Sequence, residues 1–394
     1  MSRLAVVVSH PIQYYAPLWR ALARAPGLTL HVLFASRIGL DKTFDPDMKT
    51  DVAWATDLTA GYSHEFLPEA ASIKRTGFHV DNPSLSAALD RFRPDAAIIH
   101  GYGSRTMLRA LFWCKRHGAR ALLTADSSAH VSPPGLRRRV KTLVAPWLLR
   151  RYDAALTMSD RSEAHFAALG FPRAKMFRMP VMLDEAFWAA RDARAALRAE
   201  KRVELNLDAD AFVIMAASKL TKGKRVADLV AACARLAPGA VLLIAGEGAE
   251  RARLEARAAA MGVATRFCGF VNIDALPAHY AAADVFAHAG EVEQYGIVVL
   301  EAAILGLPLA VSDETGAVGP TSIARPNENA LVFPVGDVDA IADALTRLRD
   351  ERERERMAAA SLAVSEEHRG PRSVAAVLAA AGFRKATLGD LPKD

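Results

Sequence analysis

The feature that most constrains the fold of this chain is a repeated alternation of short apolar runs with longer stretches of helical periodicity. Apolar or β-branched runs bounded by turn residues predict strands. In the N-terminal half the predicted strands are Leu4–Val8, Leu28–Phe34, Ala96–His100, Arg120–Thr124 and Ala154–Met158. Helices are predicted between them, including Tyr15–Arg24 and Ser104–Arg116. Strands separated by helices pair in parallel, because each helix returns the chain to the edge where the previous strand began.

The same alternation begins again in the C-terminal half. Its predicted strands are Phe212–Ala217, Ala240–Ala245, Thr265–Cys268, Val285–Ala287, Pro308–Val311 and Ala330–Phe333. A chain of 394 residues suits two domains. We therefore predict an α/β fold of two Rossmann-like, doubly wound domains, at residues 1–190 and 191–370, facing each other across a cleft. The charged helical stretch Glu185–Arg202 is expected to carry the chain between them, and residues 371–394 to form a helical tail that packs back on the first domain.

Polar residues follow several of the predicted strands. In an open parallel sheet the ligand binds at the carboxyl ends of the strands. These positions hold His10, His100 and Asp126 in the first half, and Lys219 and Glu293 in the second. Two such edges facing each other form a polar cleft. We expect a phosphate-bearing ligand on one domain and a second substrate on the other.

The segment from Glu293 to Pro308 carries the strongest functional signal. Gly296 permits a tight turn, and Ile297 opens a helix whose free N–H groups and dipole suit an anionic phosphate. Glu301 lies one helical turn inside, where its carboxylate suits two hydrogen bonds from vicinal ribose hydroxyls. Glu293, on the preceding loop, suits the hydroxyls of a sugar.

This order of residues, with an aromatic residue and glycine after the first glutamate and Gly-Leu-Pro after the second, resembles the Glu-x7-Glu motif of retaining GT-B glycosyltransferases of family four. The resemblance is clearest from Tyr152 to Ala340. It implies a GT-B fold and transfer of a sugar from a UDP- or GDP-sugar, with retention of configuration, to a glycan or lipid-linked acceptor. It implies neither a metal nor another cofactor.

The resemblance also assigns donor-binding residues in the second half. Lys219 and Lys224 stand where the family has two cations that hold the donor diphosphate, with lysine at 219 where arginine is usual. Gly248 belongs to a glycine turn, and Phe270 to the segment whose backbone contacts the nucleobase, although a core position suits Phe270 equally well. Tyr295 is expected on the donor side as well.

The N-terminal half departs further from the family. Many relatives have a Gly-Gly loop after the first strand, whereas this chain has the loop Ser9–Tyr15, which resembles a subgroup in bacterial polysaccharide pathways. From it, His10 and Gln13 are expected to approach the donor phosphate or the acceptor. Tyr14 and Tyr15 suit either the sugar pocket or core packing.

A second departure lies after the strand that ends at Thr124. Relatives commonly place a histidine close to the reacting sugar here, whereas this chain offers Asp126. We assign Asp126 to a contact with the acceptor or the donor sugar. His130 and His100 are alternatives for the role of the histidine.

The expected mechanism is electrostatic. As the nucleoside diphosphate leaves, Lys219, Lys224 and the helix start near Gly296 would stabilise its negative charge. No residue stands out as a covalent nucleophile, so the resemblance implies attack by the acceptor on the face that the leaving group vacates. The acidic pairs at 45–47 and 208–210 lie in turn-like context, where such residues are usually structural rather than metal ligands.

Charge and composition give weaker indications of partners and location. The net charge of +6 suits a nucleotide, an anionic membrane or a nucleic acid alike, and we expect no nucleic-acid partner. The basic stretch at residues 137–151 suits either peripheral contact with an anionic bilayer or a buried helix with solvated arginines. Absence of a signal sequence, of a membrane-spanning run and of paired cysteines predicts a cytoplasmic protein, at the inner face of the cell membrane if that stretch binds lipid.

Two other functions fit the same fold. One is a nucleotide-sugar epimerase, which would need acid and base groups around a sugar carbon. The other is a non-catalytic protein that binds a sugar nucleotide, which the departures at Lys219 and Asp126 keep open. A dehydrogenase is disfavoured, because no Gly-x-Gly-x-x-Gly follows the first strand.

Overall fold

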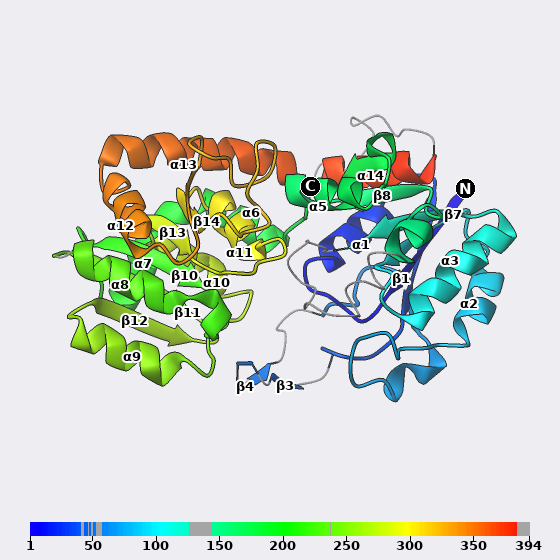
Figure 1. The fold of residues 1–394 in the computed structure, drawn as a ribbon, viewed down its shortest axis with the longest axis horizontal. Helices are drawn as coiled ribbons and strands as arrows, with labels where there is room; N and C mark the ends of the chain where they lie inside the picture. The colour runs from blue at the N-terminus through cyan, green and yellow to red at the C-terminus, as the bar shows by residue number, and fades with distance from the viewer. Residues whose placement is uncertain are drawn as a thin grey trace.

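The computed structural model describes residues 1–40, 43–45, 47–48, 50–52, 57–125, 144–236 and 238–383. These residues form two lobes, each built on a parallel sheet with helices on both faces (Figure 1). The predicted fold class, two Rossmann-like α/β domains, is confirmed.

The sheet of the first lobe has, in spatial order, the strands β5 (His64–Phe66), β2 (Leu28–Phe34), β1 (Ser2–Val8), β6 (Ala96–His100), β7 (Arg120–Thr124), β8 (Ala154–Thr157) and β9 (Met176–Arg178). All neighbours in this order pair in parallel. Alternate residues of β1 enter different cores: Leu4, Val6 and Val8 lie in one, and Ala5 and Val7 in the other. Both faces of the sheet are therefore covered, which explains the unbroken apolar runs.

The sheet of the second lobe has the spatial order β12 (Ala264–Gly269), β11 (Ala240–Ala245), β10 (Phe212–Ala217), β13 (Val285–His288), β14 (Leu309–Ser312) and β15 (Ala330–Phe333). These neighbours are again parallel. Strand order reverses direction between β10 and β13, the place where ligands bind in such sheets.

The helices of the first lobe are α1 (Ala16–Ala23), α2 (Leu85–Phe92), α3 (Arg105–His117) and α5 (Asp160–Ala168). Those of the second lobe are α6 (Glu185–Asp192), α7 (Arg194–Glu204), α8 (Val226–Leu236), α9 (Arg251–Ala260), α10 (Leu276–Ala282), α11 (Ile297–Ile304), α12 (Val338–Arg347) and α13 (Glu351–Ser365). Side-chain caps set several helix starts. Ser104 accepts from the Met107 amide, and Ser159 and Ser162 form a capping box at α5.

The charged stretch Glu185–Arg202, predicted to be helical, consists of two helices. They are α6 and α7, and they lie on either side of Ala193. Helix α6 packs against α10 and α11, while α7 packs along α10.

The chain also returns to the first lobe at its C-terminal end. Helix α13 lies along the second lobe, and α14 (Gly370–Ala381) lies on the first (Figure 1). Helix α14 packs against α1 and against β7, β8 and β9, and Ser373 donates a hydrogen bond to the carbonyl oxygen of Pro180 at 2.7 Å. The domain limits at residues 190 and 370 stay a prediction.

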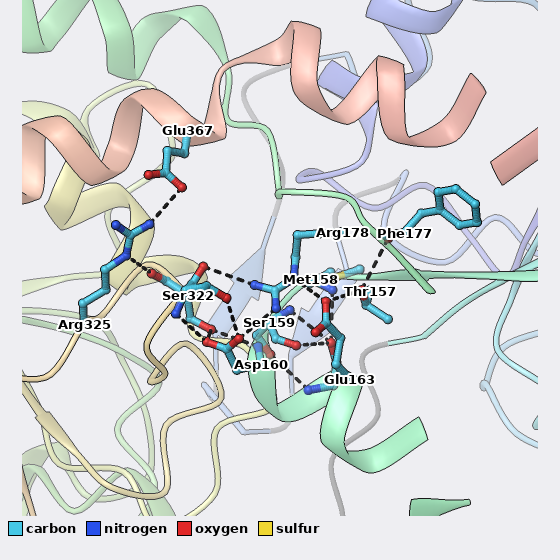
Figure 2. A network of polar contacts seen from close by, with 12 residues as sticks. Thr157, Met158, Ser159, Asp160, Glu163, Phe177, Arg178, Ser322, Arg325 and Glu367 are labelled. Atoms are coloured by element: carbon cyan, nitrogen blue, oxygen red, sulfur yellow. Dashed lines mark hydrogen bonds and ion pairs between the residues drawn. The ribbon is translucent and has the colours of Figure 1, made fainter. Parts of the chain in front are cut away.

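A polar cluster ties the two lobes together around Asp160, the first residue of α5 (Figure 2). Its carboxylate accepts hydrogen bonds from the Thr321 amide at 2.9 Å and the Ser322 hydroxyl at 2.8 Å, both in the second lobe. Arg178 of β9 pairs with it at 2.9 Å. A Cβ added at Gly319 would lie 2.2 Å from the Asp160 carboxylate, so the second lobe approaches through its backbone here.

No helix among the described residues is long and apolar enough to cross a membrane. All three cysteines of the chain, Cys114, Cys233 and Cys268, are described and are free thiols.

Candidate active site

Two glycines bring the loop that carries Lys219 close to the neighbouring strand end. The Leu220 amide donates to the Glu247 carbonyl oxygen at 2.7 Å. A Cβ at Gly246 would lie 1.9 Å from the Ser218 carbonyl oxygen, and one at Gly248 would lie 2.4 Å from that of Leu220. Gly248, predicted to bind the donor, thus packs directly against the backbone of the loop that follows β10.

Contacts between two loops bring Lys224 and Glu293 together. The Glu291 amide donates to the Gly223 carbonyl oxygen at 2.9 Å, which joins the loop after β13 to the loop after β10. The ammonium of Lys224 then lies 2.5 Å from Oε2 of Glu293, with the two side chains 23% and 19% exposed. The predicted phosphate cation and the predicted sugar-binding acid are therefore an ion pair in this structure.

Lys219 pairs across the two lobes instead. Its ammonium lies 2.8 Å from an Asp45 carboxylate oxygen and 3.4 Å from one of Asp47. Both acids belong to a hairpin of the first lobe, formed by β3 (Thr43–Asp45) and β4 (Thr50–Val52), which lies apart from both sheets and between the lobes (Figure 1). Asp45 and Asp47, predicted to be structural, thus also contact a residue of the other lobe.

The Asp45 carboxylate is held in place by its own turn. It accepts hydrogen bonds from the amides of Asp47 at 2.9 Å and Met48 at 3.0 Å. Burial raises the pKa of Asp45, but the hydrogen bonds from Lys219, Met48 and Asp47 outweigh it and leave the pKa lowered. Asp45 is therefore an anion when it faces Lys219.

Glu301 lies in the core of the second lobe, one turn into helix α11. Gly296 precedes the helix with a φ of +92°, a left-handed conformation that favours glycine, and it provides no side-chain cap. Glu301 is 3% exposed, and its Oε2 accepts a hydrogen bond from the Tyr280 hydroxyl at 2.7 Å. Burial raises the pKa of Glu301 to about 7, although the hydrogen bond from Tyr280 works against this. Sequence reasoning missed Tyr280, which is twenty-one residues away from Glu301 in the chain.

A small pocket between the lobes brings residues of both predicted subsites together. Glu301 and Ile297 line it from the second lobe, and Gln13 and Tyr14 line it from the first. The side-chain oxygen of Gln13 is buried and has no hydrogen-bond partner in the part of the chain that the structure describes. Tyr15, in contrast, is 2% exposed and stacks on Trp19, which places it in the core.

The other aromatic residues predicted on the donor side differ in their surroundings. Phe270 directly follows β12 and is partly buried, at the same sheet edge as the loop after β11. Tyr295 is 6% exposed and lies in the apolar cluster that includes Val299 and Leu300. The ring of Tyr295 therefore offers little surface to a ligand.

In the first lobe, His10 and His100 lie at neighbouring strand ends. The His10 ring is hydrogen-bonded to the Ser9 hydroxyl at 2.8 Å, and the His100 ring packs edge-on against Tyr15 with centroids 4.3 Å apart. Burial lowers the pKa of His10, and burial together with the nearby His10 lowers the pKa of His100 to about 3. Both imidazoles are therefore neutral at pH 7. Asp126 and the alternative His130 lie outside the described residues.

The loop after β14 packs against the backbone of Glu293 and Gln294. This contact was not predicted from the sequence. The Gly316 amide donates to the Glu293 carbonyl oxygen at 2.8 Å. A Cβ at Gly316 would lie 1.8 Å from the Gln294 carbonyl oxygen. A glycine shortly after a buried strand was the available signal for this close approach.

Both halves of the chain match models of known protein families. Residues 11–181 match the glycosyl transferase 4-like domain, and residues 198–362 match the glycosyl transferases group 1.

Named proteins with similar sequences are glycosyltransferases as well. A GDP-mannose-dependent alpha-(1-6)-phosphatidylinositol monomannoside mannosyltransferase of Mycobacterium tuberculosis is 35% identical over 228 residues, which cover 54% of this chain and 57% of that protein. The match thus spans little more than half of that relative's length. A 2-deoxystreptamine N-acetyl-D-glucosaminyltransferase of Streptomyces fradiae is 27% identical over 80% of this chain and 74% of that protein.

The fold agrees with solved structures over nearly its whole length. HepE of Anabaena, in complex with UDP and glucose, superimposes with a TM-score of 0.67 at 14% identity, covering 93% of this chain and 95% of that one. The two family matches, the relatives and this fold agree with one another. The chain belongs to the family-four type of GT-B glycosyltransferases.

Proposed function

We propose that this chain transfers a sugar from a UDP- or GDP-sugar to a glycan or lipid-linked acceptor, with retention of configuration and without a metal ion. The observation that carries the proposal is the convergence of Lys224, Glu293 and the uncapped start of α11 at one end of the second sheet. Lysine ammonium groups and free helix amides bind diphosphates, and carboxylates bind sugar and ribose hydroxyls. Glu301 supplies the second carboxylate, one helical turn further on.

In this mechanism the chain acts mainly on the leaving group. Lys219, Lys224 and the amides that follow Gly296 bind the diphosphate and stabilise the charge that grows on it as the bond to the sugar breaks. Glu293 holds hydroxyls of the sugar, and Glu301 those of the ribose. With two ammonium groups at the diphosphate, we expect a chelator such as EDTA to leave the rate unchanged.

Retention fits attack by the acceptor from the side of the leaving group. Glu293 is paired with Lys224, an arrangement suited to holding a sugar rather than to covalent attack. On the first lobe, Gln13, His10, His100 and Asp126 are proposed to bind the acceptor or the donor sugar. NMR of the product's anomeric signal would decide whether the configuration is kept.

A lipid-linked acceptor fits two observations. The relative from Mycobacterium tuberculosis is named for a phosphatidylinositol mannoside. In the described part of the basic stretch, Val144 and Trp147 are 49% and 52% exposed. We propose peripheral contact with the cytoplasmic face of a membrane. Wild type should sediment with anionic liposomes at low salt, whereas an Arg150→Glu/Arg151→Glu variant stays in solution. Equal recovery of both proteins in the supernatant would contradict this.

The first test of the function is a thermal-shift titration with UDP, GDP, ADP and dTDP, on wild type and on Glu301→Ala. A ligand at one hundred times its dissociation constant adds about 2.7 kcal/mol of stability. We expect one nucleotide to stabilise the wild type selectively and the variant to lose that response. No stabilisation by any of the four at millimolar concentration would remove the main support for the proposal.

Two further readouts separate the alternatives. Release of the nucleoside diphosphate from its sugar, even slowly and into water, excludes a non-catalytic sugar-nucleotide-binding protein. A changed sugar that is still attached to the nucleotide would instead identify an epimerase.

A further inference from the structure

One buried histidine beside the motif has an unsatisfied polar atom. His288 is the last residue of β13 and is 3% exposed. Among the described residues its Nε2 has no hydrogen-bond partner, and it lies 3.6 Å from Oε2 of Glu293. A buried polar atom without a partner costs free energy, so such atoms are rare and need an explanation.

The backbone of the next loop confines the imidazole at this place. A Cβ added at Gly290 would lie only 2.7 Å from Nε2 of His288. The carbonyl oxygen of Gly290 accepts a hydrogen bond from the Ser312 hydroxyl at 2.6 Å, which fixes this stretch of backbone. The ring therefore stays beside Glu293 and has little room to turn away.

Glu293 has a competing partner in this structure. The same oxygen, Oε2, that lies near His288 is 2.5 Å from the ammonium of Lys224. Burial lowers the pKa of His288, Glu293 raises it and Lys224 lowers it, and together these leave it at about 4. A neutral imidazole still carries one N–H, and it does not repel the lysine.

We propose that His288 is a positioning residue for Glu293: its Nε2–H binds the Glu293 carboxylate when Lys224 turns to the diphosphate of the donor. This inference rests on the proposed function, in which Lys224 binds the diphosphate and Glu293 binds the sugar. At that step the carboxylate, which is mostly buried, shares or loses its cation and would otherwise be left without compensation. The histidine keeps the carboxylate correctly oriented while the sugar reacts.

The test compares His288→Gln with His288→Leu. The amide nitrogen of glutamine reaches about as far as Nε2, whereas leucine fills a similar space without a donor. The substrate is the UDP- or GDP-sugar that the nucleotide titration selects, and the readout is released nucleoside diphosphate. We expect kcat to fall about ten- to hundredfold in the leucine variant, the loss of one hydrogen bond to a charged group. The glutamine variant should stay within about threefold of wild type.

The dissociation constant of the nucleoside diphosphate should change less than about twofold in both variants, because it depends on Lys219, Lys224 and Glu301. Equal losses of kcat in the glutamine and leucine variants, or a matching loss of nucleotide affinity, would show that His288 only shapes the core and would overturn the inference.

A second variant does not touch the histidine itself. Gly290→Ala should push the ring away from Glu293 and lower kcat in the same way, with an unchanged nucleotide dissociation constant. If wild type neither binds nucleotide nor releases it from a donor, the proposed function fails. If wild type is active and the leucine variant is equally fast, only the role of His288 fails.

Discussion

Glu301 is a buried carboxylate with a raised pKa, and we expect its protonation to be coupled to nucleotide binding. In the structure it is buried beneath the start of α11, with its Oε2 bound to the Tyr280 hydroxyl. Burial raises its pKa to about 7, so near neutral pH a large share of the protein carries a protonated Glu301. Ribose hydroxyls donate hydrogen bonds and therefore favour the ionised form. Nucleotide binding below pH 7 should release a proton.

The affinity for the selected nucleoside diphosphate should therefore fall as pH drops below about 7, by up to tenfold per pH unit. Calorimetric titration between pH 5.5 and 8.5 measures it, with Glu301→Gln as the matched control. Protonation of the diphosphate itself affects both proteins alike, so the difference between the two profiles reports on Glu301. Identical profiles would show that this carboxylate does not bind the ribose.

The raised pKa of Glu301 also predicts that the free energy of unfolding depends on pH. The folded pKa of about 7 lies above the ordinary value of 4.5, so this residue lowers the free energy of unfolding as pH rises from about 4.5 to 7. Above pH 7 the ionised Glu301 lowers the free energy of unfolding by its full amount. This amount is on the order of 3 kcal/mol, at 1.36 kcal/mol per pKa unit. Urea unfolding should therefore find Glu301→Gln stabilised relative to wild type at pH 8 and about equal to it at pH 4.

At the scale of elements, the β3–β4 hairpin connects a first-lobe turn to the predicted donor site. Asp45 and Asp47 face Lys219, whose ammonium is 41% exposed. Two carboxylates on this cation compete with a diphosphate for the same charge. Because the pair is partly solvated, the competition is worth little, about 1 kcal/mol or less.

Removing both charges should therefore strengthen nucleotide binding. The double variant Asp45→Asn/Asp47→Asn is expected to lower the dissociation constant of the nucleoside diphosphate about two- to fivefold, most clearly at low salt. The control is Asp57→Asn. Among the described residues, this carboxylate accepts hydrogen bonds within its own turn, from Thr59 and Ala60. Weaker binding in the double variant would mean that the hairpin supports the donor site rather than competing for it.

At the scale of the whole molecule, two kinds of connection join the lobes. The chain itself passes from one lobe to the other, and the polar cluster around Asp160 links them through side chains. Burial raises the pKa of Asp160, but hydrogen bonds from Thr321, Arg178 and Ser322 outweigh it and lower the pKa to about 2. A depressed pKa means that the ionised carboxylate stabilises the fold above about pH 4, and that this stability is lost as pH falls toward 2. We therefore expect the cluster to make the two lobes unfold together.

The variant Asp160→Asn should allow the two lobes to unfold separately. We expect a loss of about 2 to 4 kcal/mol, because Arg178 and two hydroxyls lose a partly buried anion. Differential scanning calorimetry at pH 7 should show one transition in wild type and two in the variant. Asp192→Asn, at a side chain that is 79% exposed, is the control. A single transition at an unchanged temperature in Asp160→Asn would show that the cluster does not couple the lobes.

The sequence by itself determined the two parallel sheets, and it predicts where the donor site lies. Strands buried on both faces read as continuous apolar runs, and Leu28–Phe34 and Phe212–Ala217 begin and end as predicted. The motif around Gly296 was readable because a helix start after a buried strand needs a fixed local order of residues. The short strands β5 and β9 were missed, since so few residues carry no periodicity.

Only the tertiary structure decided which charges meet. Asp45 reaches Lys219 across 174 positions of sequence, and Asp160 reaches Ser322 across 162. Tyr280 and His288 looked like ordinary core residues until packing placed them beside Glu301 and Glu293. Such pairings depend on how sheets, helices and lobes are oriented in space, and no local pattern of residues records that orientation. The sequence thus predicted the acids and lysines of the site, and the tertiary structure determined which residues they contact.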